Sequence, residues 1–142
     1  MSLEGTVGHN GDMYSTANVT LMVKDLDRSV HFYGDTLGLT LQSRHGDHWA
    51  EMVAPGMTIG LHPTDGTVVP DTSGSVSIGL LVDDFATTID ALKERGVAFD
   101  RITETDRANS AYFTDPDGHP IYVMWRAPRP VTSPSSGGIA QR

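Results

Sequence analysis

A short stretch of this sequence gathers side chains that can bind a metal ion or transfer a proton. These donors are His45, His48, Glu51 and His62. Imidazole and carboxylate groups suit divalent transition metals, so the four could form a metal site, although loop histidines three residues apart carry little specificity. His62 alone could contact a ligand or act as a general base near neutral pH. The alternative is a histidine at a strand end, hydrogen-bonded to a neighbour.

Composition excludes several other kinds of chemistry. The chain has no cysteine, which rules out disulfides, thiolate metal sites and a cysteine nucleophile. It has no phosphate-binding glycine loop, no G-x-S-x-G and no H-E-x-x-H motif. A formal net charge of −8 argues against a nucleic-acid partner, because phosphate binding needs a basic patch.

Two observations bear on where the protein acts. No apolar run approaches the roughly 20 residues that a membrane helix needs. Residues 1–14 are polar and glycine-rich, without the apolar segment of a signal peptide. We therefore expect a cytoplasmic protein with no membrane partner.

The elements that must position these side chains follow a repeating order. Residues 19–23 form an apolar strand, and Asp25 has the type and place of a helix N-cap. Apolar residues at helical spacing then predict a helix that ends before Gly38. Three further strands are predicted at 39–45, 48–53 and 57–62.

The same order recurs in the second half of the chain. A strand at 77–82 precedes a helix capped by Asp84 and ended by Gly96, and three strands follow at 98–103, 110–114 and 120–126. The segment from Val23 aligns with the segment from Val82 at an offset of 59 residues. Two strand–helix–three-strand units are hard to obtain by chance, and pairing them covers the sheet face that one unit alone would leave bare.

This pattern predicts the domain organisation. Residues 1–15 are expected to be a flexible tail, and 127–142 a disordered tail rich in proline, serine and glycine. The folded domain is 16–126, with one module at 16–63, a linker at 64–74 and a second module at 75–126. Glycines and prolines of the linker permit a lid over a cavity.

Two stretches of the sequence resemble the vicinal oxygen chelate superfamily, the glyoxalase, bleomycin resistance protein and dioxygenase family. They are Val19 to Tyr33 with Leu37-Gly38-Leu39, and Asp115-Pro116-Asp117-Gly118-His119-Pro120-Ile121. The resemblance implies an α+β fold of two βαβββ modules, whose eight strands form a curled mixed sheet around a central cavity with helices outside. It also implies a homodimer. One sequence cannot decide whether modules pair within a chain or between chains.

The resemblance also predicts where a metal would bind. Relatives that use a metal place its ligands at positions that align with Asn18, Gly60, Ser77 and Tyr122. The family uses histidine, glutamate or glutamine there, and none of the four is such a residue. We therefore predict no metal and no other cofactor. Glyoxalase, extradiol dioxygenase and fosfomycin-type thiol-transfer activities are in doubt, since each needs that metal centre.

Strand alternation predicts which side chains face the cavity. Its apolar and aromatic surface is expected from Met22, Trp49, Tyr122 and Met124, and its polar contacts from Asn18, Glu51, His62 and Ser77. Mostly apolar walls with a few polar groups are typical of a small-molecule pocket. His119, in the closing turn, is interpreted as a turn residue.

Three functions are compatible with these residues. The first is metal-independent binding of a small molecule, as in antibiotic sequestration or metabolite binding. The second is a lyase, isomerase or dioxygenase-type enzyme of the same superfamily, either metal-free with His62, Glu51 or a tyrosine as acid or base, or with a displaced metal. The third is an interaction module whose cavity is vestigial.

Overall fold

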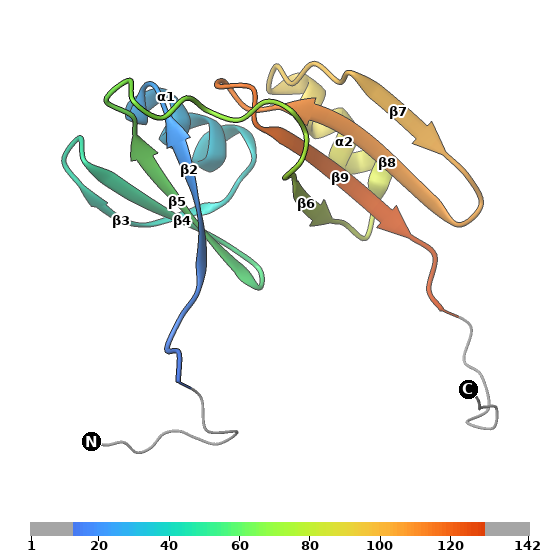
Figure 1. The fold of residues 1–142 in the computed structure, drawn as a ribbon. Coiled ribbons are helices and arrows are strands. Elements are labelled where there is room, and N and C mark those ends of the chain that lie inside the picture. Colours follow the sequence, from blue (N-terminus) through green and yellow to red (C-terminus); the bar gives the residue numbers. More distant parts are fainter. Residues whose placement is uncertain (1–12, 130–142) are drawn as a thin grey trace.

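The structure, a computed structural model, describes residues 13–129, and these contain two units with the same order of elements (Figure 1). The first unit comprises β2 (Asn18–Val23), α1 (Leu26–His31), the π-helical turn η2 (Phe32–Thr36), β3 (Thr40–His45), β4 (Trp49–Ala54) and β5 (Met57–Pro63). The second comprises β6 (Ile78–Leu81), α2 (Phe85–Glu94), β7 (Arg101–Glu104), β8 (Ala108–Thr114) and β9 (Pro120–Arg126).

Each unit contains one four-stranded sheet, with strand orders β2-β5-β4-β3 and β6-β9-β8-β7. In both sheets the first strand pairs in parallel with the last, and the other neighbours are antiparallel. The predicted α+β fold of two βαβββ units is confirmed. The eight strands form two separate sheets that do not close into a barrel, so β2 and β6 are edge strands.

Both helices begin where the sequence predicts. Asp25 accepts a hydrogen bond from the Arg28 N–H at 3.1 Å, and Asp84 accepts one from the Thr87 N–H at 3.0 Å. These bonds satisfy N–H groups that the first turn leaves without helical partners, which is the role expected of an N-cap. The first helix continues as a π-helical turn before it ends at Gly38, whose φ of 83° favours glycine.

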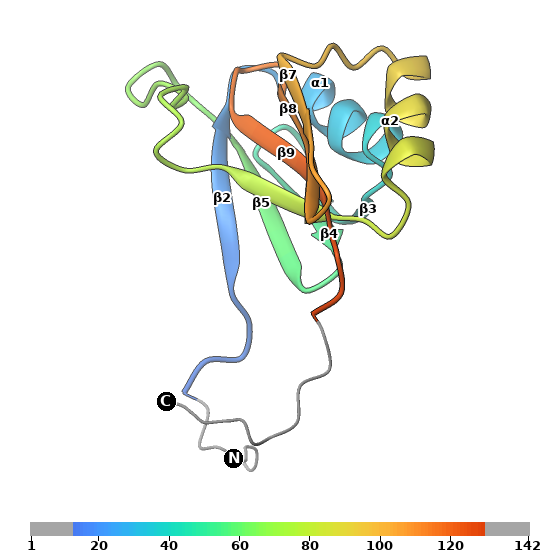
Figure 2. The same cartoon turned by 90° about the vertical axis from the view of Figure 1, so that its right-hand side faces the viewer.

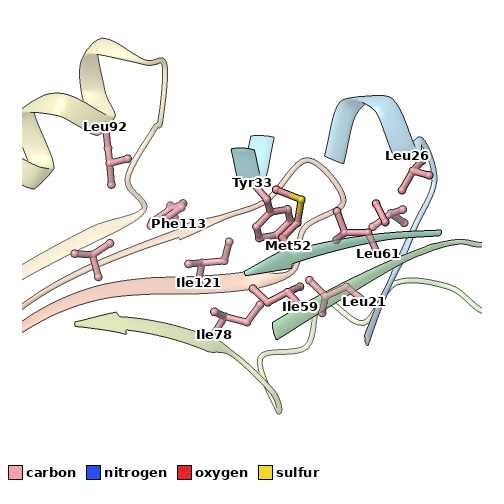
Figure 3. Packing of buried hydrophobic residues seen from close by; sticks show 13 residues of the cluster. Leu21, Leu26, Tyr33, Met52, Ile59, Leu61, Ile78, Leu92, Phe113 and Ile121 are labelled. Carbon is pink, nitrogen blue, oxygen red and sulfur yellow. The ribbon is translucent and has the colours of Figure 1, made fainter. Parts of the chain in front are cut away.

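The hydrophobic core joins the two units. Leu21, Ile59 and Met52 from the first unit belong to the same buried cluster as Ile78 and Phe113 from the second (Figure 3). The helices α1 and α2 lie on the same side of the molecule (Figure 2). The buried side chains of both sheets therefore lie on the face that the helices cover. The opposite face of each sheet, its open face, is more exposed.

No helix within residues 13–129 is both long enough and apolar enough to cross a membrane.

Candidate functional site

The open face of the first sheet carries an aromatic and a histidine. On β4 the side chains of Ala50 and Met52 are buried, so Trp49 lies on the opposite face. Its ring covers Gly60, where an added Cβ would lie 2.2 Å from the Trp49 Cη2 atom. The ring centroids of Trp49 and His62 are 6.2 Å apart at an angle of 67°. The sequence thus placed these two rings on one face correctly.

His62 stands at the exposed end of β5. Its Nδ1 atom lies 2.9 Å from the carbonyl oxygen of Pro63, which suits donation by an Nδ1–H tautomer. This contact fits the structural alternative of a strand-end histidine bonded to its neighbour. The ring lies on the open face beside Trp49. Glu51 occupies the same face, paired in register with Gly60.

The open face of the second sheet carries two tyrosines and an arginine. The Tyr122 ring covers Gly79, where an added Cβ would lie 2.3 Å from the Tyr122 hydroxyl oxygen. Tyr112 lies 6.1 Å from Tyr122 between ring centroids, and the Arg101 guanidinium carbon lies 4.3 Å from the Tyr112 centroid. A cation at that distance from a ring face is attracted by its quadrupole.

Arg101 is absent from the residues that the sequence predicts for the site. It meets Tyr112 because β7 pairs with β8 in a register that aligns these two residues. No local pattern in the sequence reveals that register. Met124, which was predicted, lies half-buried on β9 opposite Leu81.

The remaining predicted residues lie near the edges of the sheets. Asn18 is exposed at the start of β2, and Met22 is aligned with His62 in the parallel pairing of β2 with β5. Ser77 is exposed and lies just before β6, outside the strand in which it was predicted. The predicted site therefore falls into two groups, one around Trp49 and one around Tyr122, each on its own sheet.

The residues at the family's metal positions do not fit a metal ion. Gly60 offers no donor atom, and the space a side chain would use there is filled by the Trp49 ring. Asn18 and Ser77 supply an amide and a hydroxyl in place of imidazole or carboxylate. The displaced site is not assembled either. Within residues 13–129, the only group of three or more acidic and histidine side chains whose ligand atoms all lie within 4.8 Å is Asp115, Asp117 and His119.

That buried group is held together by its own hydrogen bonds. The Asp115 Oδ1 atom accepts from the backbone N–H groups of Asp117 and His119, at 2.9 and 2.8 Å. The Oδ2 atom accepts from the Tyr33 hydroxyl and from His119 Nδ1, both at 2.7 Å. A metal ion would have to displace these donors, so we interpret the group as structural.

Asp117 ties the second unit to the first. Its Oδ1 atom accepts from the backbone N–H of Lys24 at 3.1 Å and from Arg28 Nη2 at 3.2 Å. Its Oδ2 atom lies 3.4 Å from the hydroxyl of Ser29. The closing turn of the second unit therefore docks on the start of the first helix.

The pKa values of this group follow from these contacts. Burial acts to raise the pKa of Asp115, but hydrogen bonds from His119 and Tyr33 outweigh it and hold the pKa below its ordinary value. The hydrogen bond to Asp115 raises the pKa of His119, against the opposing effect of burial. Burial, followed by the charge of Asp115, raises the pKa of Tyr33 far above its ordinary value. Interpreting His119 as a simple turn residue was therefore incomplete.

Comparison with known proteins agrees with this fold. Residues 16–123 match the model of the Glyoxalase/Bleomycin resistance protein/Dioxygenase superfamily. A glutathione transferase FosA from Serratia marcescens is 30% identical over 119 aligned residues, and the match covers 77% of this chain and 79% of that protein. The chain belongs to the glyoxalase/bleomycin resistance protein/dioxygenase superfamily.

Solved structures with the same fold include an antibiotic binding protein. TnmS3 from Streptomyces sp. CB03234 is 29% identical with a TM-score of 0.63, covering 81% of this chain and 98% of its own. A glyoxalase/bleomycin resistance protein from the same organism is 32% identical with a TM-score of 0.58, covering 77% and 98%. A glyoxalase/dioxygenase from Nostoc punctiforme is 21% identical with a TM-score of 0.65, covering 89% and 100%, and shows the fold alone.

Proposed function

We propose that this protein binds a planar aromatic small molecule and sequesters it without catalysis. The observation that carries the proposal is the pair of open sheet faces, one bearing Trp49 and His62, the other Tyr112 and Tyr122 with Arg101. Aromatic rings stack on planar ligands with a large apolar area, while the flanking charged groups fix orientation. The misfit of the residues at the family's metal positions supports binding over metal-assisted chemistry.

A homodimer would complete this site. In one chain the two sheets do not close on each other, so each open face has one wall only. We propose that the face around Trp49 in one copy meets the face around Tyr122 in a second copy. Leu81, at the end of β6, is 58% exposed and would be covered at such an interface. We also propose that the protein is cytoplasmic, as the sequence predicts.

The relatives support sequestration as the use of such a site. TnmS3, with 29% identity and the same fold, is described as an antibiotic binding protein. The corresponding ligand class for this chain is an antibiotic or metabolite with a flat ring system.

The test is calorimetric titration with bleomycin and a panel of flat aromatic antibiotics. For a compound that binds, Trp49→Ala should weaken affinity about tenfold or more, because stacking and burial on one side are lost. Trp125→Phe is the matched control, since Trp125 packs beside the helix-side cluster of Phe85 and Ile89. Equal affinity of the wild type and Trp49→Ala would contradict the site. Sedimentation velocity of the wild-type protein should show a dimer. A wild-type protein that is monomeric and still binds the compound would remove the second copy from the proposal.

A second candidate is an enzyme, favoured by the 30% identity to a glutathione transferase. In that case His62 would act as acid or base on the open face. Turnover of glutathione with an electrophile such as an epoxide should then fall at least about a hundredfold in His62→Ala, while binding is kept. Absence of turnover by the wild-type protein, with and without added divalent metal, would leave sequestration as the function.

A further inference from the structure

A cavity lies at the seam between the two units, away from the aromatic rings of the open faces. Its volume is about 240 Å³, and it opens between the edge strand β2, the start of β6 and the segment 68–71. Figure 1 shows the chain between β5 and β6 crossing from one unit to the other over this region. Met22 touches both this cavity and the first open face, but Trp49, His62 and Tyr122 do not line it.

The walls of this seam cavity are mainly aliphatic. They are formed by Val19, Leu21, Val69, Pro70, Val76 and Ile78. Val69 and Val76 are 74% and 63% exposed, so apolar surface here faces water in a single chain. A ligand that covered these side chains would gain the free energy of removing apolar area from water.

His119 is the polar group at the inner side of the cavity. It is 6% exposed, and its Nδ1 atom is bound to Asp115. Within residues 13–129, no protein group hydrogen-bonds to its Nε2 atom, the ring nitrogen on the opposite side. A buried polar atom without a partner costs free energy unless something hydrogen-bonds to it. A ligand in the cavity with a polar atom near His119 could therefore supply the missing hydrogen bond to Nε2.

Asp71 is the charged group at the rim. Its carboxylate is oriented by the Ser73 N–H at 2.9 Å and the Ser75 hydroxyl at 3.0 Å, and it lines the cavity. The charge of Asp71 contributes to the raised pKa of His119, as expected for two groups that share one space. Asp115 and Asp117 lie behind the imidazole, so the surroundings disfavour an anionic ligand.

We propose that the seam cavity binds a small uncharged molecule that combines a single ring with one hydroxyl group, the hydroxyl bridging His119 Nε2 and Asp71. Because Nδ1–H is bonded to Asp115, the protonated imidazole presents Nε2–H to the cavity, and a hydroxyl can accept from Nε2–H while donating its single proton to the Asp71 carboxylate. The volume is below the roughly 300–1,000 Å³ of most ligand sites, which limits the ligand to about one ring.

The test uses p-cresol as the probe and toluene as its counterpart without a hydroxyl. Amide NMR spectra of the full chain should show p-cresol shifting residues 19–22 and 76–78, with a Kd on the order of 1 mM. Toluene should bind about fivefold or more weakly, because it supplies no hydrogen bond to His119 or Asp71. Shifts confined to the open faces, or no shifts at all, would overturn the proposal.

Variants test whether p-cresol binds in the seam cavity. Val19→Trp and Val76→Trp each place a ring at the cavity and should weaken p-cresol binding about tenfold. Ile102→Trp is the matched control, because Ile102 is an exposed aliphatic residue on β7 that does not line the cavity, and it should leave p-cresol binding unchanged. Asp71→Asn should remove most of the preference for p-cresol over toluene. An unchanged preference would overturn the role of the hydroxyl. Loss of the dimer in Val76→Trp, with no p-cresol binding to the wild type, would mean that a second copy covers the seam.

Discussion

Asp115 shows how one carboxylate can stabilise a turn and join two units. It is 4% exposed, and it accepts hydrogen bonds from two backbone N–H groups, from the Tyr33 hydroxyl and from the His119 ring. A buried carboxylate is tolerated only when such donors replace water. Tyr33 comes from the first unit, so the carboxylate that stabilises the closing turn of the second unit also fixes its position against the first.

Removing the Tyr33 hydroxyl should destabilise the protein. Tyr33→Phe keeps the fully buried ring but leaves Asp115 without one of its donors. Hydrogen bonds to charged groups contribute about 1.5–3 kcal/mol, so we expect a loss of this size in the free energy of unfolding, measured by urea denaturation. Tyr112→Phe is the control, because that ring lies half-exposed on an open face. A loss no larger than that of the control would contradict the role assigned to the hydroxyl.

The pH dependence of stability should carry the signature of His119. Its pKa in the folded protein is raised above the ordinary value of 6.5, so the folded state holds the proton more tightly than the unfolded state. The stabilisation is therefore complete below pH 6.5 and is lost as the pH rises through the folded-state pKa. The pKa of Asp115 is lowered below 3.8, so its contribution is present above pH 3.8 and is lost as the pH falls through its folded-state value.

Urea unfolding of the wild type and of His119→Gln between pH 5 and 9 measures this effect. We expect the wild type to lose stability across the alkaline part of the range and the variant to lose less, since glutamine does not titrate. NMR titration of the His119 ring gives the folded-state pKa directly. A value at or below 6.5 would show that the hydrogen bond to Asp115 does not outweigh burial.

At the scale of the elements, local chemistry made much of the fold predictable. N-caps at Asp25 and Asp84, and glycines after the helices, mark boundaries that depend only on neighbouring residues. Strand alternation placed Trp49 and His62 on one face for the same reason. The contacts between strands, such as Arg101 with Tyr112, depend on register and lay outside what local patterns determine.

His119 illustrates why part of the site could not be predicted. Its partner Asp115 lies only four residues away, and the Asp-x-x-x-His spacing around a turn was the one available signal. Its burial depends on α1 and the segment around Thr72, which pack on the closing turn from distant parts of the chain. The seam cavity is likewise a product of tertiary packing and has no signature in the sequence.

Glycines beneath the aromatic rings give a prediction at the same scale. Gly60→Ala places a Cβ 2.2 Å from the Trp49 ring, which must swing away for the protein to fold. We expect a shift of Trp49 fluorescence, recorded in a Trp125→Phe background, and a loss of roughly 1 kcal/mol in the free energy of unfolding. Gly79→Ala is the matched control, because it displaces Tyr122 on the other sheet. An unaltered Trp49 emission would contradict the close packing described here.

At the scale of the whole molecule, the two units share one core. The buried cluster contains Leu21 and Ile59 from the first unit together with Ile78, Phe113 and Ile121 from the second (Figure 3). The hydrogen bonds of Tyr33 and Asp117 cross the same boundary. Neither unit can separate without exposing apolar surface and buried carboxylates, so the repeat in the sequence does not imply two independent domains.

This shared core predicts that both units unfold in a single transition, and the two tryptophans allow a direct test. Trp49 reports on the first sheet and Trp125, at the end of β9, on the second. In the single-tryptophan variants Trp125→Phe and Trp49→Phe, each fluorescence curve in urea should therefore follow the far-ultraviolet circular dichroism of the same variant. A fluorescence midpoint that departs from the circular dichroism midpoint would show that one unit unfolds before the other. In that case the polar contacts of Asp115 and Asp117, rather than a common apolar core, would join the two units. Asp117→Asn should then increase the difference between the two midpoints, because it removes the charge that accepts hydrogen bonds from the Lys24 N–H and from Arg28.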